Sequence, residues 1–237
     1  MCVAVPMPMN ILLTIIFILF SSCGRPDLIT VPPLTSTPQG SGTSAQGTLG
    51  GQPVTDAETG TQRDTEAPKP DVDVTINEIF YDAAESDTDG HLFVELKGAP
   101  GGDISGYQVV FVNGADGKIT EQEALPDGAV IGDDGLFVMA DAKDGSTAET
   151  YVAEWDCLSD FDPQNGPDAV QVFGRSGGLL DAVCYGTVPV AVAENGSQMC
   201  GDVPAPDGPS GTSVARDAGG VFVINKAPSP GTSDVTP

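Results

Sequence analysis

Residues 73–237 are predicted to form an all-β fold of the β-sandwich type. Short apolar runs, several of them alternating with polar residues, recur along this stretch with turn residues between them. This is the pattern of strands in sheets with a buried face. The chain also contains 30 Gly and 20 Pro in 237 residues, a composition that opposes long helices and favours tight turns. About eight or nine short strands without an amphipathic helix are typical of two packed sheets.

Each expected strand is bounded by turn residues. After the first strand, Ser86-Asp87-Thr88-Asp89-Gly90 favours a turn. The second strand places Leu92, Val94 and Leu96 on one face, because side chains alternate along a strand. Arg175-Ser176-Gly177-Gly178 is expected to be the turn of a hairpin. The expected strands are Thr75–Tyr81, Leu92–Leu96, Gln108–Val112, Lys118–Gln122, Gly135–Ala140, Ala169–Phe173, Leu179–Tyr185 and Val221–Ile224.

Residues 1–22 are predicted to be a secretory signal segment. The run Ile11–Phe20 (ILLTIIFILF) is apolar except for Thr14. Ten helical residues span about 15 Å, which is half of a bilayer core of about 30 Å. The run therefore suits the apolar region of a signal peptide and not a membrane-spanning helix.

The residues after this run, Ser21 and Ser22 followed by Cys23, resemble the lipobox of bacterial lipoproteins. The resemblance implies cleavage before Cys23 and acylation of that cysteine, with palmitate among the chains that would anchor it in a membrane. Because Gly24 is not an aspartate, the resemblance places the anchor at the outer membrane or the cell surface. No Lys or Arg precedes Cys23, so an ordinary signal peptide ending near a cysteine is the alternative.

Residues 23–72 are expected to be a disordered linker. They are rich in Ser, Thr, Gly and Pro, and they carry 3 basic and 6 acidic residues with few large apolar side chains. Such a segment cannot bury enough surface to offset the loss of backbone entropy. About 48 flexible residues reach roughly 35–40 Å, so the segment fits a tether between a lipid anchor and the domain.

The charge of the chain excludes some classes of partner. The formal net charge is −25, and residues 73–237 carry 28 acidic and 6 basic side chains. Nucleic acid is not expected as a partner, because binding to phosphates needs clustered Lys and Arg. A zinc site rich in histidine is excluded because His91 is the only histidine.

Seven short motifs follow one another between residues 74 and 233. They are INEI at 76–79, FVEL at 93–96, DISGY at 103–107, LPDG with GLFV at 125–128 and 135–138, NGPDAVQV with LDAVCYG at 165–172 and 180–186, GTSVAR at 211–216 and PSPG at 228–231. In this order they resemble the lamin-tail domain family, with Tyr107 standing where the family has Trp. The resemblance implies an immunoglobulin-like sandwich that acts as an accessory module.

Three cysteines of the domain are candidates for a disulfide, because an exported domain permits one. Cys157, Cys184 and Cys200 allow three single pairings. The Cys184–Cys200 pairing closes the shortest loop and is preferred, whereas Cys157–Cys200 remains open. Such a bridge contributes roughly 3 kcal/mol to stability in the chain-entropy model. No sequence cue connects His91 to a cysteine, so a Cys–His catalytic pair is not expected.

Two glutamates and two glycines stand out in or beside the expected strands. Glu78 and Glu95 lie inside strands, where glutamate is disfavoured. They are interpreted as outward-facing or bound to neighbouring backbone amides, and the alternative is a paired-carboxylate site. Gly106 and Gly186 lie where the chain enters or leaves a strand and are expected to have positive φ.

Clustered aspartates raise the hypothesis of a calcium site. Asp160, Asp162 and Asp168 lie close together in the sequence, and calcium takes six to eight oxygen ligands. The spacing is not that of an EF-hand, since no glutamate closes a twelve-residue loop. The alternative interpretation is a solvated acidic surface that keeps the domain soluble.

The expected function is binding or structural, without catalysis. The sequence contains no nucleophile elbow, P-loop or dinucleotide fingerprint, and no cofactor is expected. We expect an envelope-anchored lipoprotein that contacts the membrane through lipidated Cys23 and displays its sandwich to an envelope protein or glycan. The alternative is a calcium-stabilised exported accessory domain, or a hydrolase acting through its acidic loops.

Overall fold

The computed structural model describes residues 69–84, 89–143, 146, 148–233, 235 and 237. The expected signal segment, Cys23 and nearly all of the expected linker lie outside the described residues. The residues from Asp71 onward belong to one compact unit. No helix long and apolar enough to cross a membrane occurs within the described part of the chain.

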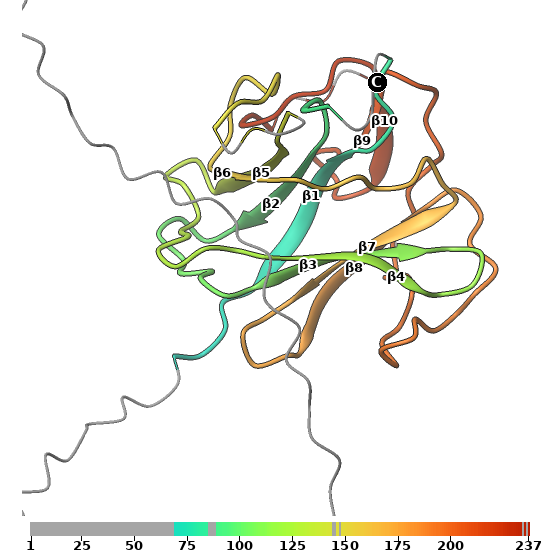
Figure 1. Ribbon diagram of the computed structural model, residues 1–237, viewed down its shortest axis with the longest axis horizontal. Helices are drawn as coiled ribbons and strands as arrows, with labels where there is room; N and C mark the ends of the chain where they lie inside the picture. The colour runs from blue at the N-terminus through green and yellow to red at the C-terminus, as the bar shows by residue number, and fades with distance from the viewer. Residues whose placement is uncertain (1–68, 85–88, 144–145, 147, 234, 236) are drawn as a thin grey trace, which may run out of the picture. The chain divides into compact units, whose positions relative to one another are not determined.

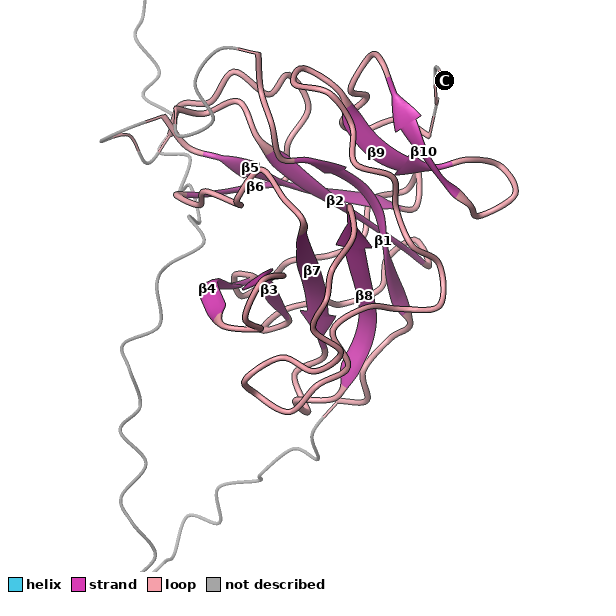
Figure 2. Ribbon diagram, turned by 90° about the vertical axis from the view of Figure 1, so that its right-hand side faces the viewer, coloured by secondary structure: helices cyan, strands magenta, loops and turns pink. Residues whose placement is uncertain are grey.

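The described residues form an all-β structure of two sheets and contain no helix. Figure 1 shows one sheet above the other, and Figure 2 shows both from the side. The strands are β1 (Val74–Phe80), β2 (Phe93–Gly98), β3 (Gln108–Asn113), β4 (Ile119–Ala124), β5 (Leu136–Asp141), β6 (Cys157–Ser159), β7 (Asp168–Phe173), β8 (Leu179–Tyr185), β9 (Ser213–Arg216) and β10 (Phe222–Asn225).

The six-stranded sheet has the order β10-β9-β1-β2-β5-β6. All of its neighbours are antiparallel except β5 and β6, which run parallel. In the central pair, Glu78 of β1 lies opposite Glu95 of β2, and Phe80 lies opposite Phe93. A register shift between Ile76 and Glu78 precedes these pairs, as at a β-bulge.

The four-stranded sheet is antiparallel throughout and has the order β4-β3-β7-β8. Its strands β7 and β8 are joined by the predicted hairpin turn, in which the Gly174 amide donates to the Gly178 carbonyl at 2.9 Å. Gly106 and Gly186 both have φ near 73°, as the sequence predicted.

The main core lies between the two sheets and draws side chains from both. Ile79, Val94 and Leu96 contribute from the six-stranded sheet, and Val109 and Val170 contribute from the four-stranded sheet. All five are fully buried. Because side chains alternate along a strand, the neighbours of these residues face outward, and two smaller apolar clusters cover parts of the outer faces.

The cluster on the outer face of the four-stranded sheet depends on a segment that follows β8. Val110, Val112 and Ala169 pack there against Ala193 and Met199. Backbone bonds hold this segment along the edge of β8, including Gly201 N–H to Ala182 O at 2.7 Å and Ala205 N–H to Cys184 O at 2.9 Å. A covered edge cannot pair with another chain.

A disulfide between Cys184 and Cys200 fixes the same segment to β8, with Cα atoms 5.1 Å apart. This is the pairing that the sequence analysis preferred, and the Cys157–Cys200 alternative is not the one formed. Cys157 lies fully buried in β6, opposite Met139 of β5.

All eight strands expected from the sequence are present, with small differences at their ends, and two further strands are found. One is β6, which has only three residues and pairs in parallel with β5. The other is β9, a four-residue strand that lies between β1 and β10. Both are too short to show a periodic pattern in the sequence.

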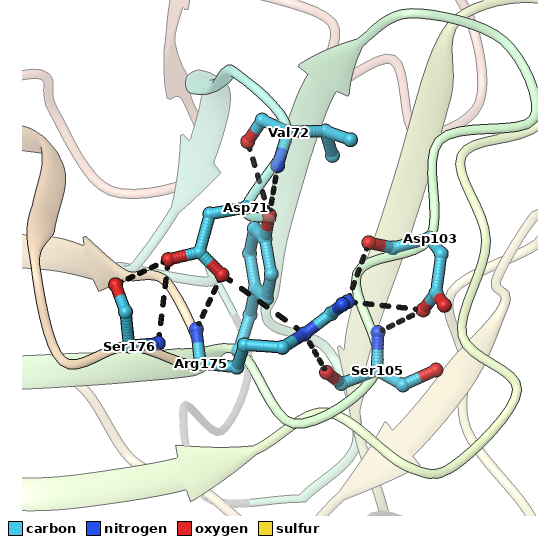
Figure 3. A network of polar contacts seen from close by, with 7 residues as sticks. Asp71, Val72, Asp103, Ser105, Arg175 and Ser176 are labelled. Atoms are coloured by element: carbon cyan, nitrogen blue, oxygen red, sulfur yellow. Dashed lines mark hydrogen bonds and ion pairs between the residues drawn. The ribbon is translucent and has the colours of Figure 1, made fainter. Parts of the chain in front are cut away.

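The chain enters the domain through a polar network, which Figure 3 shows from close by. The Tyr107 hydroxyl accepts a hydrogen bond from the Val72 amide at 2.5 Å and donates one to the Val72 carbonyl at 3.0 Å. Arg175 donates to the Asp103 carboxylate at 3.1 Å and to the Ser105 carbonyl at 3.3 Å. A tryptophan at position 107 has no hydroxyl with which to bind both backbone groups of Val72.

The carboxylate of Asp71 completes this network. It accepts a hydrogen bond from the Arg175 amide at 3.0 Å and further bonds from the hydroxyl and amide of Ser176. The Ser176 hydroxyl bond holds the pKa of Asp71 below its usual value. The first residues of the domain are therefore fastened to the β7–β8 turn by side chains as well as by the backbone.

Removing the disulfide is expected to destabilise the domain. The bridge closes a loop with a sequence separation of 16 residues, and a loop of this size corresponds to about 3 kcal/mol in the chain-entropy model. In urea unfolding of the full chain, the double variant Cys184→Ser, Cys200→Ser should lose about 2–4 kcal/mol. The exposed Val192→Ala variant in the same segment should unfold as the wild type does. An unchanged unfolding midpoint in the double variant would show that the bridge adds nothing to the packing of this segment.

Candidate functional site

The outer face of strands β1 and β2 carries both acidic and aromatic side chains. Glu78 and Glu95 form one cross-strand pair on this face, and Phe80 and Phe93 form the next. The two phenylalanine rings lie 5.9 Å apart between centroids. Phe93 also belongs to the apolar cluster that a loop around Val152 covers. The two glutamates are buried although no second sheet packs on this face. Another part of the chain must therefore cover them.

The C-terminal segment shields this face. We call residues 227–231 the strap. The Ser229 amide donates to Oε1 of Glu78 at 3.0 Å, and the Ser229 hydroxyl donates to Oε2 at 2.8 Å. The Gly231 amide donates to Oε2 of Glu95 at 2.7 Å. The two glutamates thus hold the strap through its backbone, in agreement with the interpretation that they bind neighbouring backbone amides.

Glu78 has further partners beneath the strap. It accepts hydrogen bonds from the Asn225 side chain at 3.1 Å and from the Ser213 hydroxyl. These donors come from β10 and β9, so one carboxylate connects β1 with two strands and with the strap. The sequence alternative of a paired-carboxylate site places Glu78 and Glu95 correctly as neighbours, but their oxygens are occupied by donors from the chain itself.

Glu95 is fully buried, and its carboxylate is poised between two protonation states. The pKa of Glu95 is raised to about 7, mainly by burial and also by the nearby carboxylates of Glu78 and Asp134. Hydrogen bonds from the Asn77 side chain, at 2.6 Å, and from the Gly231 amide act in the opposite direction. Burial is the largest of these effects, because a charge inside a protein loses its hydration.

Gly231 has to be a glycine in this arrangement. Its φ is 74°, a region that residues with a Cβ rarely adopt. A Cβ at this position would also lie 2.8 Å from the Cβ of Glu154. The PSPG motif therefore ends where the backbone must come close to both Glu95 and the loop beside Val152.

A pocket of about 270 Å³ lies between the strap and this loop. We call it the aromatic pocket. Its lining is apolar except for the imidazole of His91 and the hydroxyl of Tyr151. The lining residues are Phe80, His91, Phe93, Tyr151, Val152, Ala153, Pro228 and Pro230.

The rim of the aromatic pocket is a stack of three side chains. The rings of His91 and Tyr151 lie 4.3 Å apart with an angle of 15° between their planes. The ammonium of Lys143 lies 3.8 Å from the Tyr151 ring centroid, in a cation–π contact. Tyr151 remains 55% exposed. An aromatic side chain held in place by its neighbours and open to solvent is typical of a binding surface.

The structure does not bring together the aspartates proposed for calcium. Asp168 is nearly buried, and its two oxygens accept hydrogen bonds from the amides of Gly114 at 2.7 Å and Gly166 at 3.0 Å. Asp160 and Asp162 are exposed. Among the described residues, no group of three or more His, Cys, Asp or Glu side chains could hold a metal ion.

A second buried carboxylate, Asp141 at the end of β5, resembles Glu95 in its environment. It accepts hydrogen bonds from the amides of Gly90 at 2.6 Å and Phe161 at 3.4 Å. The pKa of Asp141 is raised to about 7, mainly by burial and also by the charges of Asp160 and Asp162, against the two hydrogen bonds. Two of the proposed calcium ligands thus favour the protonated form of this neighbouring carboxyl group.

The aromatic pocket has no signature in the sequence. Its lining comes from β1, the start of β2, the loop before β6 and the strap. None of these segments carries a sequence motif that indicates a binding site. His91 is half-buried beside Tyr151. The two strand glutamates and the PSPG motif were the only indirect indications of this site in the sequence. A buried carboxylate needs hydrogen-bond donors from elsewhere in the chain, and the PSPG segment supplies them.

No family model, no curated protein and no solved structure matches this chain.

The buried carboxylates predict a domain that is more stable in mild acid than in base. The pKa values of Glu95 and Asp141 are about 7 in the folded state, above their unfolded values of about 4. The folded state therefore binds protons more tightly, and the stability from protonation is complete below about pH 4 and lost as the pH rises through 7. The melting temperature of the full chain should rise by roughly 5–10 °C when the pH falls from 8.5 to 5.5.

A pair of variants tests the origin of this effect. Asp141→Asn, which cannot ionise and keeps an acceptor for the Gly90 amide, should have a smaller dependence of melting temperature on pH. The exposed Asp133→Asn should retain the dependence of the wild type. If the melting temperature instead falls on acidification, the buried carboxylates do not determine stability in this range.

Proposed function

We propose that this protein is an exported, lipid-anchored binding module without catalytic activity, and that its binding site is the aromatic pocket. The observation that carries the proposal is the stack of His91, Tyr151 and Lys143 at the rim of an apolar pocket. A preformed apolar pocket with few polar groups is the usual form of a recognition site. The buried carboxylates of Glu78 and Glu95 hold the strap and so have a structural role.

The lining of the pocket favours a protein partner over a glycan. A sugar ring offers several hydroxyls and needs a matching set of polar side chains, whereas this pocket presents one imidazole and one phenol among apolar groups. Its volume of about 270 Å³ suits a single large apolar side chain. Such anchor residues in well-packed pockets supply most of the energy of many protein interfaces.

The charge of the domain favours a basic partner. Lys118, Lys143, Arg175 and Arg216 each form an ion pair with an acidic neighbour. With 28 acidic and 6 basic side chains in residues 73–237, the domain that carries the pocket is strongly anionic. Complementary charge speeds association and selects partners. We therefore assign the site to an apolar anchor residue within a basic segment of another envelope protein.

The sandwich itself is proposed to be of the lamin-tail type, with immunoglobulin-like topology. The seven motifs between residues 74 and 233 support this proposal by their order. Their positions are also consistent with it, because INEI and FVEL lie in the paired strands β1 and β2 and PSPG lies in the strap. In this interpretation the family motifs mark the contacts between the glutamates and the strap.

The lipid anchor is proposed from the apolar run Ile11–Phe20 and the small residues before Cys23. In bacterial cells labelled with radioactive palmitate, the wild type should take up label and separate with the membranes, at the outer membrane or cell surface. Cys23→Ser should lose both properties, because it has no thiol to acylate. Cys2→Ser, which changes a cysteine of the segment expected to be removed, is the matched control and should remain labelled. Label in the Cys23→Ser variant would contradict the anchor.

The binding site can be tested with synthetic peptides. A peptide with a tryptophan between four lysines should bind the full chain carrying Cys23→Ser, measured by titration calorimetry at low salt. The affinity should fall as salt screens the charges. A second substitution, Tyr151→Ala, should weaken binding at least about tenfold, because it removes the exposed part of the rim. The exposed Val192→Ala, far from the pocket in sequence, should bind as its parent does.

Two control ligands separate the alternatives. A peptide with a tryptophan between four glutamates should bind at least about tenfold more weakly than the lysine peptide, because the anionic surface repels it. A soluble peptidoglycan fragment should not compete. Equal binding of the two peptides, or competition by the peptidoglycan fragment, would overturn the assignment to a basic protein segment.

A further inference from the structure

The strap is both a wall of the aromatic pocket and the cover of the buried glutamates. Pro228 and Pro230 line the pocket, whereas Ser229 and Gly231 face the sheet and donate to Glu78 and Glu95. Alternate residues of one short segment thus serve the two purposes. The strap cannot leave the sheet without removing the wall of the pocket, and it cannot leave without exposing the two carboxylates to water.

We propose that the strap is a gate whose closed position completes the aromatic pocket. It opens, and so removes one wall of the pocket, when the carboxylate of Glu95 ionises and becomes hydrated. This regulation of binding rests on the proposed function of the pocket. The opening of the strap itself is a property of the domain and needs no ligand.

The closed strap can accommodate a protonated Glu95. In the ionised form, both oxygens accept hydrogen bonds, one from the Asn77 side chain and one from the Gly231 amide. A protonated carboxyl has to donate one hydrogen bond as well. Asn77 can supply the acceptor, because a rotated amide presents its oxygen in place of its nitrogen. Gly231 keeps its bond to the carbonyl oxygen, so the strap stays closed over a neutral and fully hydrogen-bonded side chain.

The charges around Glu95 act against its ionised form in the closed state. Glu78 faces it from β1, and Asp134 faces it from the turn before β5; burial and these two carboxylates together raise the pKa of Glu95 to about 7. Glu154 adjoins the strap at Gly231. On the same face of β2, Lys97 is the charged group of opposite sign, and it is exposed two residues away.

These charges determine whether a rise of pH opens or closes the strap. In the open state Glu95 is hydrated, so its pKa returns toward the ordinary value of about 4.3. The closed state therefore binds a proton more tightly than the open state does. Mild acid keeps the strap closed, and a rise of pH through about 7 favours opening. For one such group, the open population increases about tenfold between pH 6 and pH 8.

Hydrogen exchange of the full chain measures this opening directly. The amides of Ser229 and Gly231 exchange with deuterium only when they leave the two carboxylates, provided that the rest of the domain stays folded. After correction for the intrinsic effect of pH on exchange, their protection in the wild type should fall about tenfold between pH 6 and pH 8. The amide of Val94, which exchanges only when the whole domain unfolds, should stay far more protected than the strap amides at both pH values, which shows that the strap opens without unfolding of the domain.

Three variants make the test specific. Glu95→Gln, which cannot ionise, should keep a protection of the strap that does not depend on pH. Glu154→Gln is the matched control at an exposed carboxylate beside the strap, and it should retain the tenfold change. Ser229→Ala removes one bond to Glu78, so it should lower protection at every pH and leave the pH dependence intact. Constant protection in the wild type, or a tenfold change in Glu95→Gln, would refute the gate.

The experiments can refute the proposed gate and the proposed binding site independently of each other. If the strap opens as described but the lysine–tryptophan peptide does not bind at any pH, the proposed function is wrong and the gate stands. If the peptide binds with the same affinity at pH 6 and pH 8 while protection of the strap stays constant, the pocket is a binding site and the gate is wrong. If the strap opens with pH while binding is unchanged, the strap does not control the pocket.

Discussion

The outer face of strands β1, β2 and β5 imposes the main constraint on this domain. The inner face of these strands packs in the core between the sheets, yet their outer side chains are also buried, among them Phe93 and Val138. A second sheet does not cover this side, and the chain has no helix among its described residues. Two irregular segments cover it instead: the loop that leads into β6, and the strap.

Glutamates make the strap possible. Irregular backbone presents amide groups that need acceptors when they are buried, and a flat apolar face offers none. Glu78 and Glu95 supply carboxylate oxygens at the right places, opposite each other in the register of β1 and β2. The cost is two acidic groups within one buried region, and the raised pKa of Glu95 expresses that cost. The aromatic pocket is the space that remains where the two irregular covers meet.

Much of the fold could be predicted because the information was local. Each of the eight expected strands has its own apolar run and turn residues, and the shortest loop among the cysteines identified the bridge between Cys184 and Cys200. The two strands that were not predicted, β6 and β9, form by pairing with distant strands and have no sequence pattern of their own. Similarly, Asp160, Asp162 and Asp168 are close in sequence, but the backbone amides that bind Asp168 could not be identified without the fold. The pocket could not be predicted, because Tyr151 and Pro230 meet only through the register of other strands.

The network at the start of the domain has a mechanical consequence. Val72 is held by Tyr107, immediately before β1 begins, whereas the pocket lies beyond the other end of that strand, at Phe80. Seven residues of β1 separate these points by about 20 Å. A pulling force transmitted through the preceding chain reaches Tyr107 and the β7–β8 turn first. The contacts at Val72 and Asp71 thus bear this force before it reaches the aromatic pocket.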